Sequence, residues 1–302
     1  MENYNIKIND NLTLIGYKYL ASGEVKGQIV ICHGMAEHIE RYDHFANFLA
    51  SNGYLVYGYN QRGHGLTAGS VEKLGYMDKK DNFKAMISDL HHVISLVKEE
   101  NPTLKTYLFG HSMGSFISKR YIQLYPNDLT GVVLCGSSLN KGALFKVAYC
   151  LASILTTFQG RKHKSKLLNS LSFGSYNNCF KPNRTEFDWL SSNEENVDKY
   201  IADEYCGTVF STSFFKDMTH MFNQTGRCYG KENKDLPILM IGGEMDPVSE
   251  NSKGLVKLEE VYKKKGIKDV NLIIYPGMRH EILNETDNSK VYNDVLSWLL
   301  CH

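Results

Sequence analysis

Residues 106–124 read TYLFGHSMGSFISKRYIQL, and Gly110–Gly114 within them has the pattern G-x-S-x-G. The pattern joins an apolar run to a helix-like run. A serine on such a sharp turn from strand to helix presents its hydroxyl outward, and the glycines are needed because side chains there would clash with neighbouring backbone. The stretch therefore predicts a nucleophile elbow, with Ser112 as nucleophile and Gly110 and Gly114 as its glycines. Taken alone, the five residues also fit an ordinary glycine-bounded turn.

A serine nucleophile needs a histidine base and an acid. On this kind of scaffold they follow it in the order Ser, Asp, His, each just after a later strand. One apolar run leads into GGEMDP, which contains Asp246, and an alternating run leads into PGMRHE, which contains His280. Glu244 is a rival acid. We prefer Asp246 because Pro247 is expected to open a helix, which leaves Asp246 near the carboxyl end of the strand.

The chain has 11 histidines, and His280 is the one that follows the last expected core strand. The others are interpreted as surface, cap or loop residues: His33, His38, His44, His64, His91, His92, His111, His163, His220 and His302. His33 and His38 could form a metal pair, but no cysteine or carboxylate cluster at ligand spacing accompanies them. The sequence therefore predicts neither a metal site nor a cofactor.

The third requirement is a pair of backbone donors for the oxyanion, since losing one donor costs about 3 to 4 kcal/mol of transition-state stabilisation. Residues 28–32 read as a buried strand, and His33, Gly34 and Met35 follow it. On this scaffold one N–H comes from that loop and the other from the residue after the nucleophile. We expect the backbone amides of Met35 and Met113 to be these donors.

Four segments together resemble the monoacylglycerol lipase and lysophospholipase group of the α/β-hydrolase superfamily, which is serine aminopeptidase S33-like. They are HGMAEHIERYDHFANFLASNGYLVYGYNQRGHG, the elbow GHSMGS, the acid loop GGEMDPVS and the base loop GMRHEILNE. The resemblance spans nearly the whole chain. It implies a serine carboxylesterase that acts, through an acyl-enzyme, on a small lipid-like single-chain ester, either a monoacylglycerol or a lysophospholipid. It also implies the triad Ser112, Asp246 and His280 with the donors Met35 and Met113.

Other functions stay open beside this resemblance. A serine peptidase or acyltransferase would use the same scaffold, because a fold does not fix the leaving group. A non-catalytic homologue that keeps the pocket as a ligand receptor is a third function, which the intact Ser112, Asp246 and His280 argue against. The elbow serine excludes a hydrolase with an acidic nucleophile. The chain departs from many relatives at Asn60, where they carry an acidic residue, and this bears on charge-dependent contacts there and not on the triad.

The overall composition bounds the partners. The 302 residues carry 34 Lys and Arg against 33 Asp and Glu, a net charge of +1, so no nucleic-acid partner is expected. The amino terminus is polar and no run approaches the roughly 18 apolar residues that span a bilayer, so we expect neither a secretory signal nor a membrane span. Seven scattered cysteines without C-x-x-C indicate reduced thiols in a cytoplasmic protein. The oligomeric state is not predicted.

Apolar and β-branched runs recur along the chain as expected strands, at 12–19, 28–32, 54–59, 106–109, 132–135, 238–241 and 272–275. Helical patterns, such as those at 41–51 and 82–99, separate most of them. This alternation predicts right-handed crossovers and a mostly parallel central sheet flanked by helices, which is the α/β-hydrolase fold. The first two runs are expected to pair as an antiparallel hairpin through residues 21–26.

The alternation breaks for roughly 90 residues, which is too long for a loop and predicts a helical insertion. Its helices are expected at 143–158 and 211–222. The predicted division is a first core segment at 1–137, a helical cap at 138–226 and a second core segment at 227–302. Such a cap would exclude water and provide an apolar wall for an acyl chain.

The cap also carries a basic run, RKHKSK at 161–166, directly after its apolar first helix. A basic cluster beside an exposed apolar helix is suited to peripheral contact with an anionic membrane surface. A solvated helix end explains the same residues, so membrane contact through the cap stays an open expectation.

Overall fold

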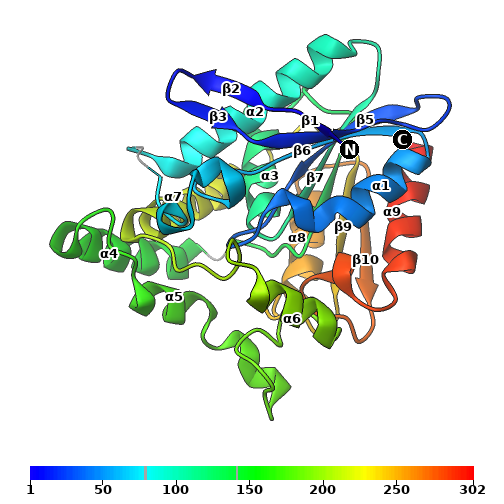
Figure 1. Ribbon diagram of the computed structural model, residues 1–302. Coiled ribbons are helices and arrows are strands. Elements are labelled where there is room, and N and C mark those ends of the chain that lie inside the picture. The colour runs from blue at the N-terminus through cyan, green and yellow to red at the C-terminus, as the bar shows by residue number, and fades with distance from the viewer. Residues whose placement is uncertain (78–79, 141) are drawn as a thin grey trace.

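The computed structural model describes residues 1–77, 80–140 and 142–302. Within these residues an eight-stranded sheet forms the centre of the molecule, in the order β1-β4-β6-β5-β7-β8-β9-β10 (Figure 1). The strands from β6 to β10 pair in parallel, whereas β1 and β4 are antiparallel at one edge. The bounds are β1 (Glu2–Asn3), β4 (Gly16–Tyr19), β5 (Gly27–Cys32), β6 (Tyr54–Tyr59), β7 (Thr106–His111), β8 (Gly131–Cys135), β9 (Ile238–Gly243) and β10 (Val270–Tyr275). The mostly parallel sheet predicted from the sequence is confirmed.

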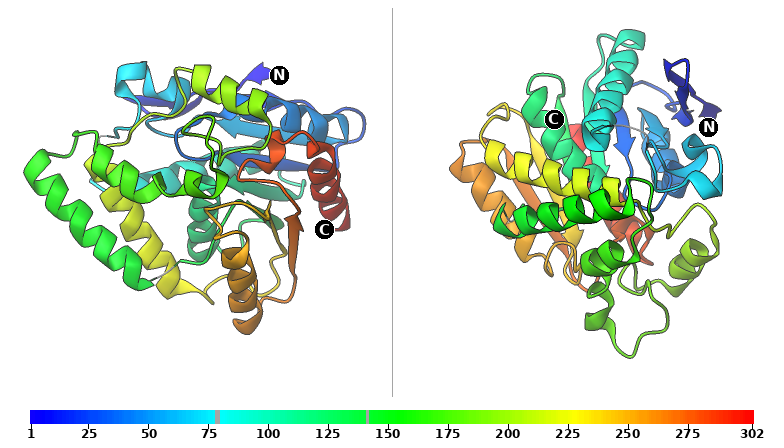
Figure 2. Two further views of the ribbon diagram at one scale, coloured as in Figure 1. Left: turned by 90° about the horizontal axis from the view of Figure 1, so that it is seen from below. Right: turned by 90° about the vertical axis from the view of Figure 1, so that its left-hand side faces the viewer.

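Helices cover both faces of the sheet (Figure 2). Their bounds are α1 (Asp43–Ser51), α2 (Asn82–Glu100), α3 (Met113–Leu124), α8 (Lys253–Lys264) and α9 (Asn288–Cys301). Residues of α1 and α9 share one buried cluster with Ile29 and Ile31 of β5, while residues of α2, α3 and α8 share the other with Val30 and Cys32. A strand that is buried on both faces reads as a continuous apolar run, which is why β5 was visible in the sequence.

The predicted hairpin between the first two runs is wrong. The first run divides at Ile15, whose N–H donates to the Thr67 hydroxyl at 2.9 Å. Before it, β3 (Leu12–Leu14) pairs with β2 (Ile6–Asn9) in a separate two-stranded sheet. After it, β4 pairs with β6. The two strands can approach closely because Gly16 has no side chain; a Cβ there would lie only 2.7 Å from the Gly58 carbonyl oxygen.

Pro247 does not open a helix, so this part of the argument for Asp246 is also wrong. Instead, Pro247 belongs to a turn in which the Asn251 N–H donates to the Asp246 carbonyl at 2.8 Å. Residues 250–252 all have left-handed φ angles, between 52° and 65°, and α8 begins only at Lys253. Asp246 nevertheless stands three residues after the end of β9, at the carboxyl edge of the sheet.

The segment between β8 and β9 is helical, as predicted. It contains α4 (Gly142–Gln159), α5 (Lys166–Phe173), the 3-10 turn η4 (Tyr176–Phe180), α6 (Glu194–Ala202) and α7 (Thr212–Cys228). The helices α4 and α7 lie side by side (Figure 2), and α7 also packs against α2 and α3. We propose 138–226 as a cap on this basis, although α7 runs past its second boundary and Lys141 lies outside the described residues.

One expectation about apolar segments needs correction. The sequence was not expected to contain a segment comparable to a membrane span, but the 18-residue helix α4 is long and apolar enough to cross a membrane by length and composition. Few of its residues are buried, so α4 is not a core helix. Its exposed apolar face therefore requires an explanation other than packing in a core.

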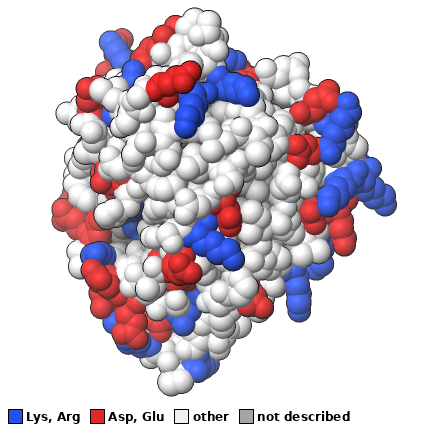
Figure 3. Space-filling view, turned by 90° about the vertical axis from the view of Figure 1, so that its right-hand side faces the viewer, with Lys and Arg blue, Asp and Glu red and all other residues white. Residues whose placement is uncertain are grey.

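The surface charges bear on possible polyanion partners. On the face shown in Figure 3, acidic and basic side chains are interspersed, and neither sign forms a broad field. This arrangement agrees with the net charge of +1. That face therefore lacks the basic stripe by which nucleic-acid-binding surfaces are recognised.

A buried carboxylate on α7 makes stability depend on pH. Burial, reinforced by Asp81, raises the pKa of Asp217 to about 6, although its carboxylate accepts the Asn82 N–H at 3.0 Å. Between the ordinary pKa of an aspartate and about pH 6, Asp217 therefore keeps its proton in the folded protein but loses it in the unfolded chain. The free energy of unfolding falls as the pH rises through this range, and the loss is complete above it. Asp217→Asn should stabilise the protein by about 1 kcal/mol at pH 8, since water screens part of the effect, and by nothing near pH 4.

Urea unfolding at both pH values measures this gain. The matched control is Asp10→Asn, because Asp10 is exposed and pairs with Lys7, which is exposed as well. This control should show no gain that depends on pH. An equal gain for Asp217→Asn at pH 4 and pH 8 would contradict the assignment of the raised pKa.

Candidate active site

Ser112 stands at the turn between β7 and α3, with φ of 50° and ψ of −120°. A non-glycine residue holds such a conformation only where its surroundings fix it. Here the Ser112 N–H donates to the Cys135 carbonyl at 2.9 Å. A Cβ at Gly114 would collide with the Cys32 carbonyl, and one at Gly110 would lie 2.6 Å from the Gly114 carbonyl oxygen. The local geometry thus requires glycine on both sides of the serine, as an elbow does.

Asp246 and His280 are in direct contact. His280 Nδ1 lies 2.9 Å from Asp246 Oδ1, and the same oxygen accepts the Val248 N–H at 2.9 Å. The loops that carry them follow β9 and β10, which are parallel neighbours. Both residues are almost completely buried, with exposed fractions of 0% for Asp246 and 2% for His280. A carboxylate that accepts Nδ1–H leaves Nε2 as the free acceptor, which is the tautomer that a general base needs.

Ser112 lies at the same edge of the sheet as this pair. The ring of its neighbour His111 is centred 4.8 Å from the ring of His280. Gly136 lies against both rings: a Cβ there would be 3.0 Å from His280 Cε1 and 3.4 Å from His111 Nε2. Among the described residues no hydrogen bond joins Ser112 Oγ to His280; in enzymes without substrate such bonds are often long and tighten when substrate binds.

The loop after β5 approaches the serine from the other side. A Cβ at Gly34 would lie 3.2 Å from the Cβ of Ser112, so this loop is next to the elbow. Ala36, which follows Met35, has a φ of 58°, and its carbonyl accepts the Gly207 N–H at 3.0 Å and the Tyr200 hydroxyl at 2.9 Å. The predicted donor loop is thereby held by residues of the cap segment. The other predicted donor, Met113, is the first residue of α3, where helical N–H groups have no intrahelical acceptor.

A buried charged cluster behind these residues was missed by the sequence analysis. Arg41 donates to both carboxylate oxygens of Glu281 at 2.6 Å and to Glu37 Oε2 at 2.9 Å. Glu37 Oε1 also accepts the Gly34 N–H at 2.6 Å and faces His111 Nδ1 at 3.2 Å. The cluster therefore connects the donor loop, the elbow and the residue after His280. We call Glu37, Arg41, His111 and Glu281 the charge cluster.

Mutual pairing decides the protonation of the charge cluster. Burial opposes ionisation, but the hydrogen bond and charge of His111, with that of Arg41, hold the pKa of Glu37 well below its usual range. Against burial as well, Arg41 lowers the pKa of Glu281, and Glu37 raises the pKa of His111. The carboxylates of Glu37 and Glu281 thus face the Arg41 guanidinium and the imidazole of His111, whose raised pKa favours the protonated form. The opposite charges make this buried group tolerable.

Removal of Arg41 should reveal how much the charge cluster contributes to stability. Arg41→Met leaves the carboxylates of Glu37 and Glu281 buried without their cation, so we expect a loss of about 3 to 5 kcal/mol in the free energy of unfolding at pH 7. Urea denaturation measures it. The matched control is Arg184→Met, because Arg184 pairs with Asp198 at the surface. Exposed pairs contribute about 0 to 1 kcal/mol, and equal losses in both variants would contradict the role given to the cluster.

Two histidines that were interpreted as surface, cap or loop residues are completely buried. Burial lowers the pKa of His33 to about 4 and that of His64 to about 3, so both are neutral at pH 7. His33 Nδ1 lies 2.7 Å from the Gly34 carbonyl, and its Nε2 accepts the Gln61 N–H at 3.0 Å. The ring therefore fixes the Gly34 peptide in the donor loop and is a structural residue.

Asn60 also has a structural explanation. Its side-chain oxygen accepts the Ile39 N–H at 2.9 Å, and its amide donates to Glu40 Oε1 at 3.0 Å. A carboxylate at this position would have no proton to donate and would face Glu40 as a like charge. The asparagine at position 60 is therefore matched to the acid beside it.

Comparison with known proteins extends this description. Residues 23–287 match the family described as Serine aminopeptidase, S33. The chain is similar to the monoacylglycerol lipase of Mycolicibacterium smegmatis, with 27% identity over 279 residues that cover 92% of this chain and 89% of that protein. It is also similar to human monoglyceride lipase, with 26% identity over 284 residues that cover 92% and 84% of the two chains.

Solved structures share the fold at low identity. A thermostable carboxyl esterase from Bacillus coagulans, in complex with glycerol, superposes with a TM-score of 0.92 at 24% identity, covering 99% of this chain and 97% of that chain. A soluble variant of monoglyceride lipase from Saccharomyces cerevisiae, in complex with a substrate analog, gives 0.74 at 22% identity and coverage of 99% and 94%. An epoxide hydrolase from Vigna radiata still gives 0.68 at 14% identity, covering 100% and 98%. Such similarity establishes the α/β-hydrolase fold and not the reaction.

Proposed function

The chain belongs to the serine aminopeptidase S33 family of α/β-hydrolases, and from this membership we propose that it hydrolyses single-chain acyl esters, with monoacylglycerols as the preferred class. The enzyme is a serine hydrolase of the lipase and esterase type. The observation that carries the proposal is the buried pair of His280 and Asp246, which lies at the same sheet edge as the strained Ser112. The names of the two similar lipases support the choice of substrate class.

The proposed reaction has two steps. His280 Nε2 takes the proton of Ser112 Oγ, and this oxygen attacks the acyl carbon. The resulting oxyanion accepts hydrogen bonds from the backbone N–H groups of Met35 and Met113. The alcohol leaves with the proton that His280 held. Water then repeats the sequence on the acyl-enzyme and releases the fatty acid. Asp246 holds the imidazole and stabilises its cation without taking the proton. This chemistry needs no metal or cofactor.

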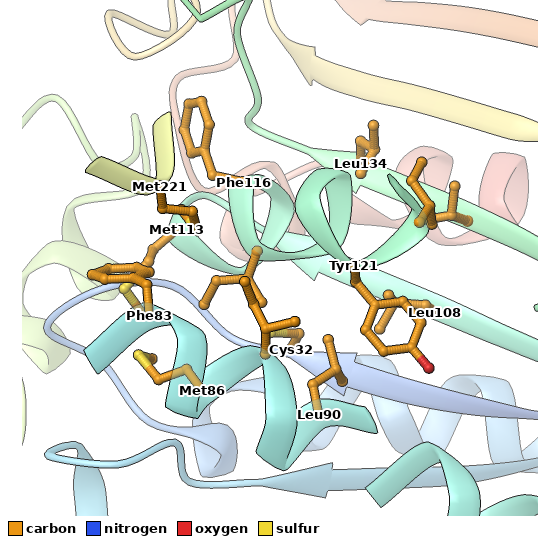
Figure 4. Packing of buried hydrophobic residues seen from close by; sticks show 14 of the residues in the cluster. Cys32, Phe83, Met86, Leu90, Leu108, Met113, Phe116, Tyr121, Leu134 and Met221 are labelled. Carbon is orange, nitrogen blue, oxygen red and sulfur yellow. The ribbon is translucent and has the colours of Figure 1, made fainter. Parts of the chain in front are cut away.

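Buried apolar side chains beside the elbow are compatible with an acyl-chain substrate. Met113 and Phe116 of α3 belong to the same buried cluster as Met221 of α7 (Figure 4). The ring of Phe116 is centred 4.6 Å from that of Phe222. Since α7 belongs to the proposed cap, the cap places apolar side chains directly over the start of α3.

A substrate panel tests the proposed function. We expect monooleoylglycerol to give the highest kcat/KM, followed by oleoyl lysophosphatidylcholine, with no turnover of an aminoacyl amide. The Ser112→Ala variant serves as the blank for each substrate. Preference for the amide would instead favour the peptidase function. Lack of turnover with every ester, together with lack of labelling by a fluorophosphonate, would favour a non-catalytic homologue.

We also propose that the cap contacts membranes peripherally, since lipid substrates reside there. Large apolar side chains on α4 and α5 are exposed, with exposed fractions from 53% to 83%: Leu144, Val147, Ile154, Phe158, Leu167 and Leu171. The basic run at 161–166 joins the two helices. Apolar and basic groups on one surface together favour binding to anionic membranes.

Vesicle sedimentation tests this contact. The wild type should bind anionic vesicles, and the double variant Ile154→Asp with Phe158→Asp should bind much less, because two charges would enter the apolar boundary of the membrane. The control is Leu300→Asp on α9, another exposed apolar side chain. Equal lack of binding to anionic and neutral vesicles would end the proposal.

The cytoplasmic location stays a proposal based on the thiols. The seven cysteines, all of them described, are free in the structure, which fits a reducing compartment.

A further inference from the structure

In the sequence the possible metal-binding partner of His38 is His33, but the fold gives His38 other neighbours. Asp203 and Cys206 lie in the connection between α6 and α7, far from His38 along the chain. The ligand atoms of His38, Asp203 and Cys206 all lie within 4.8 Å of one another. His38 Nε2 and Asp203 Oδ2 are 2.7 Å apart. An imidazole, a carboxylate and a thiol thus converge on one point that is partly open to solvent.

We propose that His38, Asp203 and Cys206 form a binding site for Zn²⁺, with solvent as the fourth ligand. Thiolate and imidazole ligands favour zinc over the harder cations Mg²⁺ and Ca²⁺. Zinc bonds of about 2.0 to 2.3 Å place neighbouring tetrahedral ligand atoms about 3.3 to 3.8 Å apart. To reach this spacing, His38 Nε2 and Asp203 Oδ2, which are 2.7 Å apart, must separate slightly. The thiol proton and the proton shared by His38 and Asp203 leave to solvent.

The surroundings of His38 support this assignment independently. Its Nδ1 donates to Glu40 Oε2 at 2.6 Å, so this carboxylate orients the ring and turns Nε2 toward Asp203 and the proposed metal position. Histidines that bind metals almost always have such a partner. Glu40 itself is oriented by the Tyr17 hydroxyl at 2.8 Å and by the Asn60 amide at 3.0 Å. This gives Asn60 a second role, because an acidic residue there could not donate to Glu40.

The Asp203 turn presents the other two ligands on the same side. The Tyr205 N–H donates to Asp203 Oδ1 at 2.9 Å, which leaves Oδ2 for the metal. The Cys206 N–H donates to the Asp203 carbonyl at 3.0 Å, which closes a tight turn. The next residue, Gly207, donates its N–H to Ala36 in the donor loop. Bound Zn²⁺ would therefore tie the cap connection to the loop that follows β5.

Cobalt provides a direct test on the purified full chain, and its outcome does not depend on hydrolysis. After chelator treatment, we expect one equivalent of Co²⁺ to produce a thiolate-to-cobalt absorption band in the near ultraviolet, and Zn²⁺ to abolish it by displacement. The Cys206→Ser variant should lack the band. The matched controls Cys150→Ser and Cys179→Ser remove exposed thiols elsewhere and should keep it. A band that survives Cys206→Ser, or no band at all, would refute the site.

Two further variants distinguish the loss of a metal ligand from a general disturbance of the fold. Asp203→Asn should weaken Co²⁺ binding, and Glu40→Gln should weaken it about 10- to 100-fold by releasing His38 from its orientation. Thermal unfolding gives a second readout: Zn²⁺ should raise the Tm of the wild type and leave that of folded Cys206→Ser unchanged. An equal rise in Tm with Mg²⁺ would contradict a thiolate site.

Discussion

Replacement of Ser112 with alanine should lower kcat/KM for a short p-nitrophenyl ester by about 10⁴- to 10⁶-fold while the protein stays folded. The physical reason is that the hydroxyl is the atom that bonds to the acyl carbon, so the chain would lose the acyl-enzyme route altogether. Alanine tolerates the elbow backbone no worse than serine does, and Gly110 and Gly114 still make room for the turn. Steady-state hydrolysis, with far-ultraviolet circular dichroism for the fold, measures both parts.

The matched control is Ser137→Ala. Ser137 is completely buried and follows β8 at the same edge of the sheet, and its hydroxyl has no hydrogen-bond partner among the described residues. This variant should retain most of the activity and should still react with a fluorophosphonate, whereas Ser112→Ala should not react. Substantial turnover by folded Ser112→Ala would overthrow the proposed nucleophile.

The elements that the sequence predicted well are those whose residues carry the information locally. The elbow is an example, because Gly110, Ser112 and Gly114 lie within five consecutive residues and their steric requirement is visible in the pattern. The run at 28–32 is another, because a strand buried on both faces is mostly apolar, as residues 29–32 are. Asp246 and His280 could be proposed from the sequence because each follows a strand in a known chain order. Their contact at 2.9 Å depends on β9 and β10 being neighbours, which the order implies.

The features that the sequence analysis missed depend on contacts between distant residues. Glu37 and Arg41 look like ordinary helix-start charges until Glu281, more than two hundred residues later, completes the pair. His38, Asp203 and Cys206 have no common spacing, so no motif contains them. The helix predicted at Pro247 was wrong because proline is favoured both near the start of a turn and in the first position of a helix. The wrong hairpin at β4 has a similar cause, since turn residues show where a chain reverses and not which strand it pairs with.

A second large effect is expected for Asp246→Asn, which should lower kcat by about 10⁴-fold. Asp246 Oδ1 accepts from both Val248 and His280, so an asparagine that turns its amide nitrogen to His280 gives up the bond from the Val248 N–H. Its amide would donate to His280 Nδ1, and the imidazole proton would then move to Nε2, where it faces Ser112. The base would be blocked because its lone pair points away from the serine. Steady-state kinetics and the downfield N–H proton resonance of His280, which should disappear in this variant, measure the two consequences.

Glu244→Gln separates this explanation from the rival acid. Glu244 is exposed, and its carboxylate accepts the Gly277 N–H at 3.0 Å, which a glutamine side chain can also do. Since no contact joins Glu244 to His280 among the described residues, loss of its charge should leave kcat close to that of the wild type. If Glu244→Gln were the more damaging variant, the acid that orients His280 would be Glu244, and the hydrogen bond of Asp246 would be structural. Asp246→Asn and Glu244→Gln each remove one negative charge, at positions two residues apart. A difference in kcat between them therefore reports the orientation of the His280 imidazole and not the loss of charge in this loop.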